Sequence, residues 1–243
     1  MYKFGWIKQP LDIRDKKYKL VREILPTSID LSLNMPAVFD QGNYSSCVGN
    51  GIATAIEYSA KRNILDCKDM IRSRMFIYYN ARKLENVTFE DNGCNIRDGI
   101  KSINSAGCCS ETTWDYTEPH LFTMPDDNAF SEALTHKTVS YTAVDITNVK
   151  SALNAQYPVV LGMDVFPQFE SSDAQSTGTI TMPLPYQGLV GRHCIVCFGF
   201  DDEKQVWKCR NSWGEAWGDH GNFTLPYGYE QYWDDLWQIQ VVS

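Results

Sequence analysis

The spacing of apolar residues predicts helices in the first half of the chain. Three segments show the helical period, residues 47–62, 71–85 and 96–105. In the first of them, Val48, Ile52 and Ile56 recur every four positions and so fall on one helix face. Ser46 stands at the N-cap position of this helix, and Gly107 follows the third helix as a residue type that commonly ends one.

The pattern changes to that of β-strands after about residue 137. Short runs rich in β-branched and aromatic residues follow one another, separated by turn residues. These runs are TVSYTAVDI, YPVVLGMDV, HCIVCFGF, QVWKCRN and GNFTLPY, and a short helix is expected at about 147–156. A helical half followed by a strand-rich half predicts an α+β fold with two lobes. We place the folded domain at 25–243, with a mainly helical lobe at about 34–125 and a mainly β lobe at about 126–243.

Residues 1–24 differ from the rest of the chain in charge. They hold seven basic and three acidic residues, a net charge of +4, which leaves −12 on the remainder of a chain whose net charge is −8. The same segment carries four aromatic residues, Tyr2, Phe4, Trp6 and Tyr18. Because opposite charges attract, we expect this basic N-terminal arm to dock on the acidic body.

The overall composition is that of a folded protein. The chain is 43% hydrophobic and 21% charged, and its pI near 5.0 argues against nucleic-acid binding, which normally needs a basic surface. No apolar run approaches the ~18 residues of a membrane span. The first residues also lack the apolar stretch of a secretion signal. We therefore expect neither a nucleic-acid nor a membrane partner, and an intracellular location.

The eight cysteines do not form a metal-binding pattern. They stand at positions 47, 67, 94, 108, 109, 194, 197 and 209. Cys194 and Cys197 make a C-x-x-C, but it lies in a predicted strand, where residues three apart point to opposite faces. With no export signal, free thiols are the expected state, although the sequence does not exclude disulfides. We expect no metal and no cofactor.

Three residues suggest nucleophilic chemistry. Cys47 begins a predicted helix, where unpaired N–H groups and the helix dipole favour an anion, so we expect a lowered thiol pKa. On position alone, a structural cysteine is the commoner role. His193 opens one predicted strand and Asn211 closes the next, so antiparallel pairing would bring them together. The asparagine oxygen can then hold one imidazole nitrogen while the other faces a thiol.

Two longer motifs carry a resemblance to a known family. Residues 41–47, QGNYSSC, and residues 211–221, NSWGEAWGDHG, resemble the nucleophile and asparagine segments of the papain-like cysteine peptidases. His193 lies 146 residues after Cys47, near the upper end of the roughly 130–150 residues typical of these enzymes. Asn211 lies 164 residues after it, and the excess suggests a loop insertion within 166–190.

Further segments narrow the resemblance. GWI-x-x-P-L-D-I-R-D, SRMFIYYNAR and GCNIRDGI are similar to a branch of short, signal-less papain-like proteins of microbes and large DNA viruses. The resemblance implies a papain-like two-lobe fold, with the active-site cleft between a helical lobe and a β-barrel-like lobe. It also implies a cysteine endopeptidase acting on peptides or proteins, packaged in a virion if the chain is viral.

The resemblance also assigns roles residue by residue. Cys47 would attack the scissile carbonyl, and His193 would act as acid and base, held by Asn211. Gln41 and the Cys47 backbone N–H would form the oxyanion hole. Trp213 would shield the histidine–asparagine hydrogen bond and contact the substrate. The substrate backbone would lie along Asn92 and Gly93.

Some positions depart from the family pattern. Tyr44 replaces a cysteine, so the usual disulfide there is absent. Gly49 and Gly51 should weaken the first helix, by about 1 kcal/mol each relative to alanine. Arg192 stands before His193, where a cation should lower the imidazole pKa.

Other functions stay open at this point. A binding protein on a silent papain-like scaffold is one, although such proteins usually lack the cysteine or histidine. An exopeptidase usually needs a loop with paired histidines, and residues 107–120 are short and hold only His120. Acyl transfer is disfavoured because such enzymes prefer aspartate where Asn211 stands. We also expect the arm, as a short propeptide-like segment, to limit access to Cys47.

Overall fold

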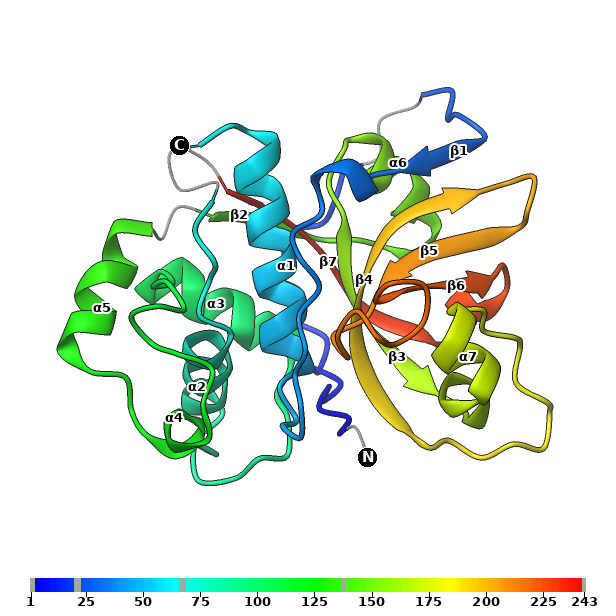
Figure 1. The fold of residues 1–243 in the computed structure, drawn as a ribbon. Helices are drawn as coiled ribbons and strands as arrows, with labels where there is room; N and C mark the ends of the chain where they lie inside the picture. Colours follow the sequence, from blue (N-terminus) through cyan, green and yellow to red (C-terminus); the bar gives the residue numbers. More distant parts are fainter. Residues whose placement is uncertain (1–2, 20–22, 66–68, 137–138, 242–243) are drawn as a thin grey trace.

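The computed structural model describes residues 3–19, 23–65, 69–136 and 139–241. Tyr2 and Arg22 of the arm, and Cys67, lie outside the described residues. Most of the helices gather on one side, and most of the sheet lies on the other together with the short helices at 149–154 and 172–177 (Figure 1). The helices are α1 Cys47–Arg62, α2 Arg74–Leu84, α3 Ile96–Ala106, α4 Glu118–Phe122, α5 Asp127–Ala133, α6 Val149–Asn154 and α7 Ser172–Thr177. The 3₁₀ turns are Ser32–Asn34, Leu134–His136, Ile146–Asn148, Pro167–Glu170 and Tyr229–Tyr232.

The sheet has seven antiparallel strands, in the order β2-β7-β3-β4-β5-β6, with β1 paired to β4. Their bounds are β1 Ser28–Asp30, β2 Val139–Ala143, β3 Val159–Val165, β4 Gly191–Asp201, β5 Val206–Arg210, β6 Asn222–Pro226 and β7 Trp233–Val241. The α+β class, the three main helices, the short helix α6 and the five strands expected from the sequence are confirmed.

Two strands and part of one loop differ from the sequence expectation. We did not predict β1 or β7, although β7 lies inside the sheet between β2 and β3. Its acidic residues Asp234 and Asp235 interrupt the apolar pattern near its start. The turn-rich stretch 166–190 is not all loop, because it contains α7 and the turn before it.

Helix α1 forms the centre of the molecule and positions the site at its first residue. It is buried from Cys47 through Ala60. A Cβ at Gly49 would lie 2.6 Å from the Arg74 carbonyl oxygen, and one at Gly51 would lie 3.0 Å from Cys194 Sγ. The two glycines therefore let α1 approach α2 on one side and β4 on the other, and the helix runs unbroken.

Ser46 stands at the N-cap position of α1, as predicted, but its side chain does not cap the helix. Its hydroxyl instead pairs with the Tyr116 hydroxyl and accepts from Asn50 Nδ2 at 3.2 Å. Gly107 does end α3, with a left-handed φ of 79°.

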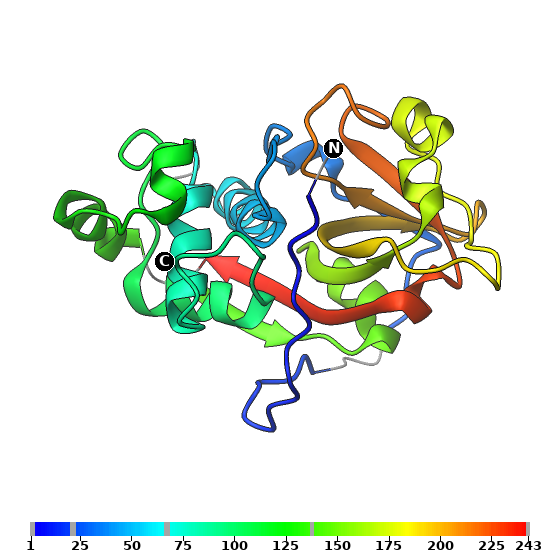
Figure 2. The ribbon, with the colours of Figure 1, turned by 90° about the horizontal axis from the view of Figure 1, so that it is seen from below.

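The N-terminal segment runs between the helices and the sheet (Figure 2). It crosses the molecule as an extended chain, and its backbone pairs with residues from both sides. None of the helices in the described ranges is long and apolar enough to cross a membrane.

Candidate active site

The structure brings the three predicted catalytic side chains together. Cys47 begins α1, His193 lies near the start of β4, and Asn211 follows the last residue of β5. His193 Nε2 donates to Asn211 Oδ1 at 2.8 Å. The amide of Cys194, next to the histidine, donates to Cys47 Sγ at 3.4 Å. His193 Nδ1 has no hydrogen-bond partner among the described residues, so it is available as a proton acceptor.

Gln41 is held rigidly beside this trio. Its backbone N–H donates to the Ser212 carbonyl at 2.8 Å, and its side-chain oxygen accepts from the Ser212 hydroxyl at 2.7 Å. These bonds leave the amide nitrogen to donate, and it does so to the carbonyl oxygens of Lys3 at 2.9 Å and Tyr44 at 2.8 Å. The Gln41 amide is therefore oriented to hold a backbone carbonyl in the cleft, as an oxyanion-hole donor must.

Aromatic rings surround the histidine–asparagine hydrogen bond. The Trp213 ring lies 5.2 Å from the His193 ring, and the Phe169 ring lies 6.0 Å from it. Asn211 is only 3% exposed. Because water is excluded here, the hydrogen bond is stronger than it would be in solvent. Trp217 packs against Trp213 with ring centroids 5.3 Å apart and extends the aromatic group.

The arm lies directly over the catalytic residues. The Phe4 ring is 5.8 Å from the His193 ring. Cys94 donates its N–H to the Gly5 carbonyl at 3.0 Å and accepts from the Ile7 N–H at 3.0 Å, which makes a parallel bridge at Trp6. The arm thus occupies the path along which an extended peptide would bind.

Gly93 makes this close approach possible. Its φ is +93°, and a Cβ there would lie 2.1 Å from the Gly5 carbonyl oxygen. The predicted substrate segment therefore lies along the arm through Gly93 and Cys94. The side chain of Asn92 does not join it, because it is turned to Glu90 at 2.8 Å.

Ion pairs fasten the arm to both sides of the cleft. Within the described residues, four pairs join the arm to the body, Lys3–Asp91 at 2.8 Å, Lys8–Asp234, Arg97–Asp15 at 2.6 Å and Lys17–Asp145 at 3.7 Å. In three of them the arm supplies the cation, in keeping with its net positive charge. Arg97 and Asp15 are both largely buried, so this reversed pair is the one least screened by solvent.

Burial of the catalytic residues reverses one expectation about acidity. The prediction of a lowered thiol pKa is wrong for this state, because burial raises the pKa of Cys47 to about 11. Backbone hydrogen bonds from Cys194 and Gly5 offset only part of that rise. Burial also lowers the pKa of His193 to about 4. With the arm in place, the neutral thiol and neutral imidazole are therefore the favoured pair.

The lowered histidine pKa does not come from its cationic neighbour. Arg192 is half exposed, and its guanidinium pairs with Asp164 at 3.1 Å. Loss of water around His193 is the cause that lowers its pKa, and the Asn211 hydrogen bond opposes it. The pKa of His193 is therefore lowered, as expected, but the cause is burial and not the charge of Arg192.

Sequence patterns missed several residues of the site. Cys94 contributes only its backbone, Ser212 only orients Gln41, and Gly5 and Trp6 belong to the arm. The sequence signals that could have found them are the serine inside the Asn-Ser-Trp-Gly block and the aromatic residues spaced along the arm.

A cysteine, histidine and asparagine beside an oriented glutamine define a thiol peptidase site on a two-lobe α+β fold. The chain belongs to the papain family of cysteine proteases, whose family model matches residues 25–234. The papain-like fold expected from the sequence, with its cleft between a helical and a β lobe, is confirmed.

One known sequence and one solved structure are similar to this chain over nearly its whole length. An uncharacterised peptidase C1-like protein of Acanthamoeba polyphaga mimivirus is 35% identical over 272 aligned residues, covering 99% of this chain and 87% of that protein. Xylellain, a cysteine protease from Xylella fastidiosa, has a TM-score of 0.91 and 33% identity, covering 99% of this chain and 96% of xylellain. Both fit the microbial and viral branch indicated by the sequence.

A more distant structure shares the fold alone. Digestive procathepsin L 3 of Tenebrio molitor larval midgut has a TM-score of 0.72 at 16% identity, covering 94% of this chain and 75% of that protein.

Proposed function

We propose that the protein hydrolyses peptide bonds through a thioester on Cys47. His193 accepts the thiol proton through Nδ1, and Cys47 Sγ attacks the scissile carbonyl carbon. Gln41 and the Cys47 N–H hold the resulting oxyanion. The C–N bond then breaks as His193 gives the proton to the leaving amine, and water hydrolyses the thioester with His193 as base. The observation that carries this proposal is the 2.8 Å bond from His193 to Asn211, with Cys47 beside Cys194.

The proposed roles of Cys47 and His193 fix the direction in which a substrate runs through the cleft. The leaving amine must lie near His193, and Trp213 beside it lines an open groove with Trp217 and Asp40. The leaving segment therefore lies in this groove. The acyl segment lies on the other side of Cys47, along Cys94.

Internal cleavage is the activity that the site favours. The segment that blocks the cleft in some exopeptidases is short here. Its histidine, His120, stacks on Trp114 with ring centroids 3.6 Å apart and pairs with Asp115 at 2.6 Å. His120 is thereby held against the helical lobe, which supports endopeptidase activity over exopeptidase activity.

The arm acts in this proposal as an inhibitor that resists cleavage. Its Lys3 carbonyl lies at Gln41, and the chain then passes over Cys47 toward Cys94 and the acyl side. A substrate runs the other way, from the acyl side to the leaving side. The arm therefore presents its peptide bonds to Cys47 with reversed polarity, and it blocks access without serving as a substrate.

Free thiols support a reducing location, inside a cell or a virion. All seven cysteines within the described residues are free and buried. Mass analysis of protein alkylated under denaturing, non-reducing conditions should find every cysteine modified. A pair of cysteines protected until a reductant is added would contradict this location.

Covalent labelling tests the proposed function. The full chain is incubated with a peptidyl epoxide, and the adduct is mapped by mass. Labelling at Cys47 that disappears in His193→Ala supports the proposal, and labelling at no cysteine would favour a silent scaffold. A quenched peptide blocked at both ends separates the two peptidase classes, because only an endopeptidase cleaves it.

A further inference from the structure

Tyr116 is bonded to the loop that carries Gln41. Its hydroxyl donates to the Gln41 backbone carbonyl at 3.0 Å and also pairs with the hydroxyl of Ser46, the residue before Cys47. The Gln41 backbone N–H donates to the Ser212 carbonyl at 2.8 Å. The Gln41 backbone is therefore held at both of its polar groups, and one of the two partners also reaches the start of α1.

Both proposed oxyanion donors lie next to a contact of this hydroxyl. The Gln41 side-chain amide extends from the backbone that Tyr116 holds, and the Cys47 N–H follows Ser46 directly along the chain. An oxyanion hole needs its donors about 2.7–3.1 Å from the developing charge, and a misplacement of about 1 Å can cost about 100-fold in rate. The position of one hydroxyl thus sets the spacing of the two donors.

A chain of hydrogen bonds fixes the direction in which the Tyr116 proton points. Arg74 Nη1 donates to Asn50 Oδ1 at 3.0 Å, which turns Asn50 Nδ2 toward the Ser46 hydroxyl at 3.2 Å. Ser46 then donates to the Tyr116 hydroxyl, and Tyr116 donates to Gln41. A guanidinium has donors only, so every proton along this chain has one acceptor assigned to it. Ser46 and Asn50 are fully buried, and in such surroundings linked hydrogen bonds strengthen one another.

Arg74, at the start of this chain, is itself held by its neighbours. Glu111 accepts from its guanidinium with both carboxylate oxygens, at 2.8 and 2.6 Å. The guanidinium lies 3.8 Å from the centre of the Tyr116 ring, and it donates to the carbonyl of Asp40 at 3.0 Å. A planar group with this many fixed partners makes a rigid base for the chain of hydrogen bonds.

We propose that Tyr116 is a positioning residue of the oxyanion hole, which places the Gln41 amide relative to the Cys47 N–H. This role rests on the proposed peptidase function and adds to it a residue that contacts no reacting atom. Tyr116 acts through Gln41, and the oxyanion forms only as the transition state is reached. Loss of the Tyr116 hydroxyl therefore lowers kcat and leaves KM near the wild-type value.

Removal of the hydroxyl alone tests this role in the full chain. Tyr116→Phe keeps the ring against Arg74 and takes away the bond to Gln41. We expect kcat on a quenched peptide to fall about tenfold, less than the roughly 10²–10³-fold of a lost oxyanion donor. Saturating peptide displaces the arm, so a change in arm binding would alter KM and not kcat. Tyr58→Phe is the matched control, because it also loses a tyrosine bond to a backbone carbonyl, that of Gln156 at 3.2 Å, and it should keep the wild-type kcat.

A second substitution in the same chain of hydrogen bonds gives a result even if Tyr116→Phe fails to fold. Ser46→Ala leaves Tyr116 bonded to Gln41 but removes the donor that orients the Tyr116 proton. We expect kcat to fall about two- to fivefold in this variant, with KM unchanged. An unchanged kcat in Ser46→Ala would contradict the role of the chain.

Double substitutions show whether Tyr116 acts through Gln41. In a Gln41→Ala background the amide that Tyr116 places is gone, so adding Tyr116→Phe should change kcat less than about twofold. A merely structural tyrosine would lower kcat by the same factor in both backgrounds. A further loss of about tenfold in the double variant would therefore overturn the proposal.

The outcomes separate this role from the peptidase activity itself. A kcat in Tyr116→Phe equal to that in Tyr58→Phe would overturn the positioning role alone. No hydrolysis by the wild type, with no epoxide adduct at Cys47, would overturn the proposed function and this role with it.

Discussion

On one side of Cys47 the cleft is filled, and on the other it is open. The acyl side holds Trp6 against Asp235 and pairs Cys94 with the arm. The leaving side keeps a groove lined by Asp40, Glu170 and Trp217 among others. The cysteine, histidine and asparagine are already side by side while the protein's own chain covers them, so we infer that control lies in occupancy of the cleft and not in the formation of the site.

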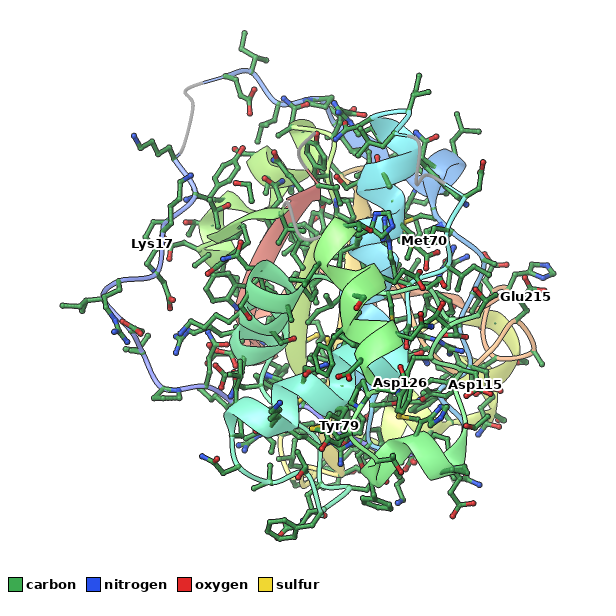
Figure 3. All side chains as sticks on the ribbon, turned by 90° about the vertical axis from the view of Figure 1, so that its left-hand side faces the viewer. Lys17, Met70, Tyr79, Asp115, Asp126 and Glu215 are labelled. Carbon is green, nitrogen blue, oxygen red and sulfur yellow. The ribbon has the colours of Figure 1, made fainter. Side chains whose placement is uncertain are left out.

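The two sides of the cleft also differ in their contacts with the arm. Beyond the cleft the arm continues along the body to Lys17, which Figure 3 labels on the opposite side of the molecule from Glu215 of the loop at the open groove. No arm residue lines that groove within the part of the chain that the structure describes.

Loss of the catalytic pair should have the largest effect. Cys47→Ser and His193→Ala should each lower kcat/KM by about 10⁴-fold or more, as removal of a nucleophile or its base does in related mechanisms. Initial rates on a quenched peptide measure this. His120→Ala is the control and should retain activity, since His120 packs on Trp114. Equal losses of activity in His193→Ala and His120→Ala would contradict the assignment of His193 as the catalytic base.

Gln41→Ala should have the next largest effect. Loss of one oxyanion donor lowers kcat by about 10²–10³-fold. Because Gln41 also holds the Lys3 carbonyl, the same change should speed epoxide labelling of Cys47 by loosening the arm. Gln231→Ala, in an exposed turn where the Gln231 amide donates to the Gly228 carbonyl, should change neither rate. A fall in hydrolysis together with slower labelling would show that Gln41 does not hold the arm over Cys47.

Charge reversal in the arm should act more weakly. Lys3→Glu replaces an ion pair with Asp91 by a like-charge contact. It should raise the rate of peptide hydrolysis about two- to fivefold at low salt, and less at high salt. Lys17→Glu is the matched control, because its pair is exposed on both sides and 3.7 Å long. An equal response of the two variants would show that the cleft contacts have no special role.

A buried carboxyl in the helical lobe should alter stability and leave the cleft unchanged. Burial raises the pKa of Glu57 to about 7, so between about pH 4.5 and 7 the folded state holds a proton that the unfolded state has lost. Stability from this group is therefore present at low pH and lost as pH rises through that window. Glu57→Gln should be more stable than the wild type at pH 8, by about 1–3 kcal/mol, and should approach it near pH 5.

Urea unfolding at the two pH values measures this difference. Peptide hydrolysis at pH 8 should stay near the wild-type rate in Glu57→Gln. If Glu57→Gln changed hydrolysis as strongly as it changed stability, the helical lobe would be energetically coupled to the cleft. The contrast between the covered and open sides predicts no such coupling.

Local motifs made the catalytic trio predictable. Cys47 begins a helix with a clear apolar period, and His193 and Asn211 stand at the facing ends of consecutive strands. Antiparallel pairing of β4 with β5 was enough to join them.

Contacts between distant segments were not predictable in the same way. Burial raises the pKa of Cys47, while a backbone hydrogen bond from Gly5 of the distant arm offsets part of that rise, and no local pattern encodes either effect. Asp235 was missed because a bulge in an unpredicted strand turns it into the cleft. The Ser46 side chain makes no capping hydrogen bond to α1, and its hydroxyl pairs instead with Tyr116, seventy positions away.

The rate at which a peptidyl epoxide modifies Cys47 in the full chain tests the central claim most directly. Trp6→Ala removes the buried anchor of the arm, a change that typically costs about 3–5 kcal/mol of packing. The account predicts slow modification of the wild type, modification at least about tenfold faster in Trp6→Ala, and none when His193→Ala is added. Equal rates in the wild type and Trp6→Ala would show that the arm does not guard the nucleophile.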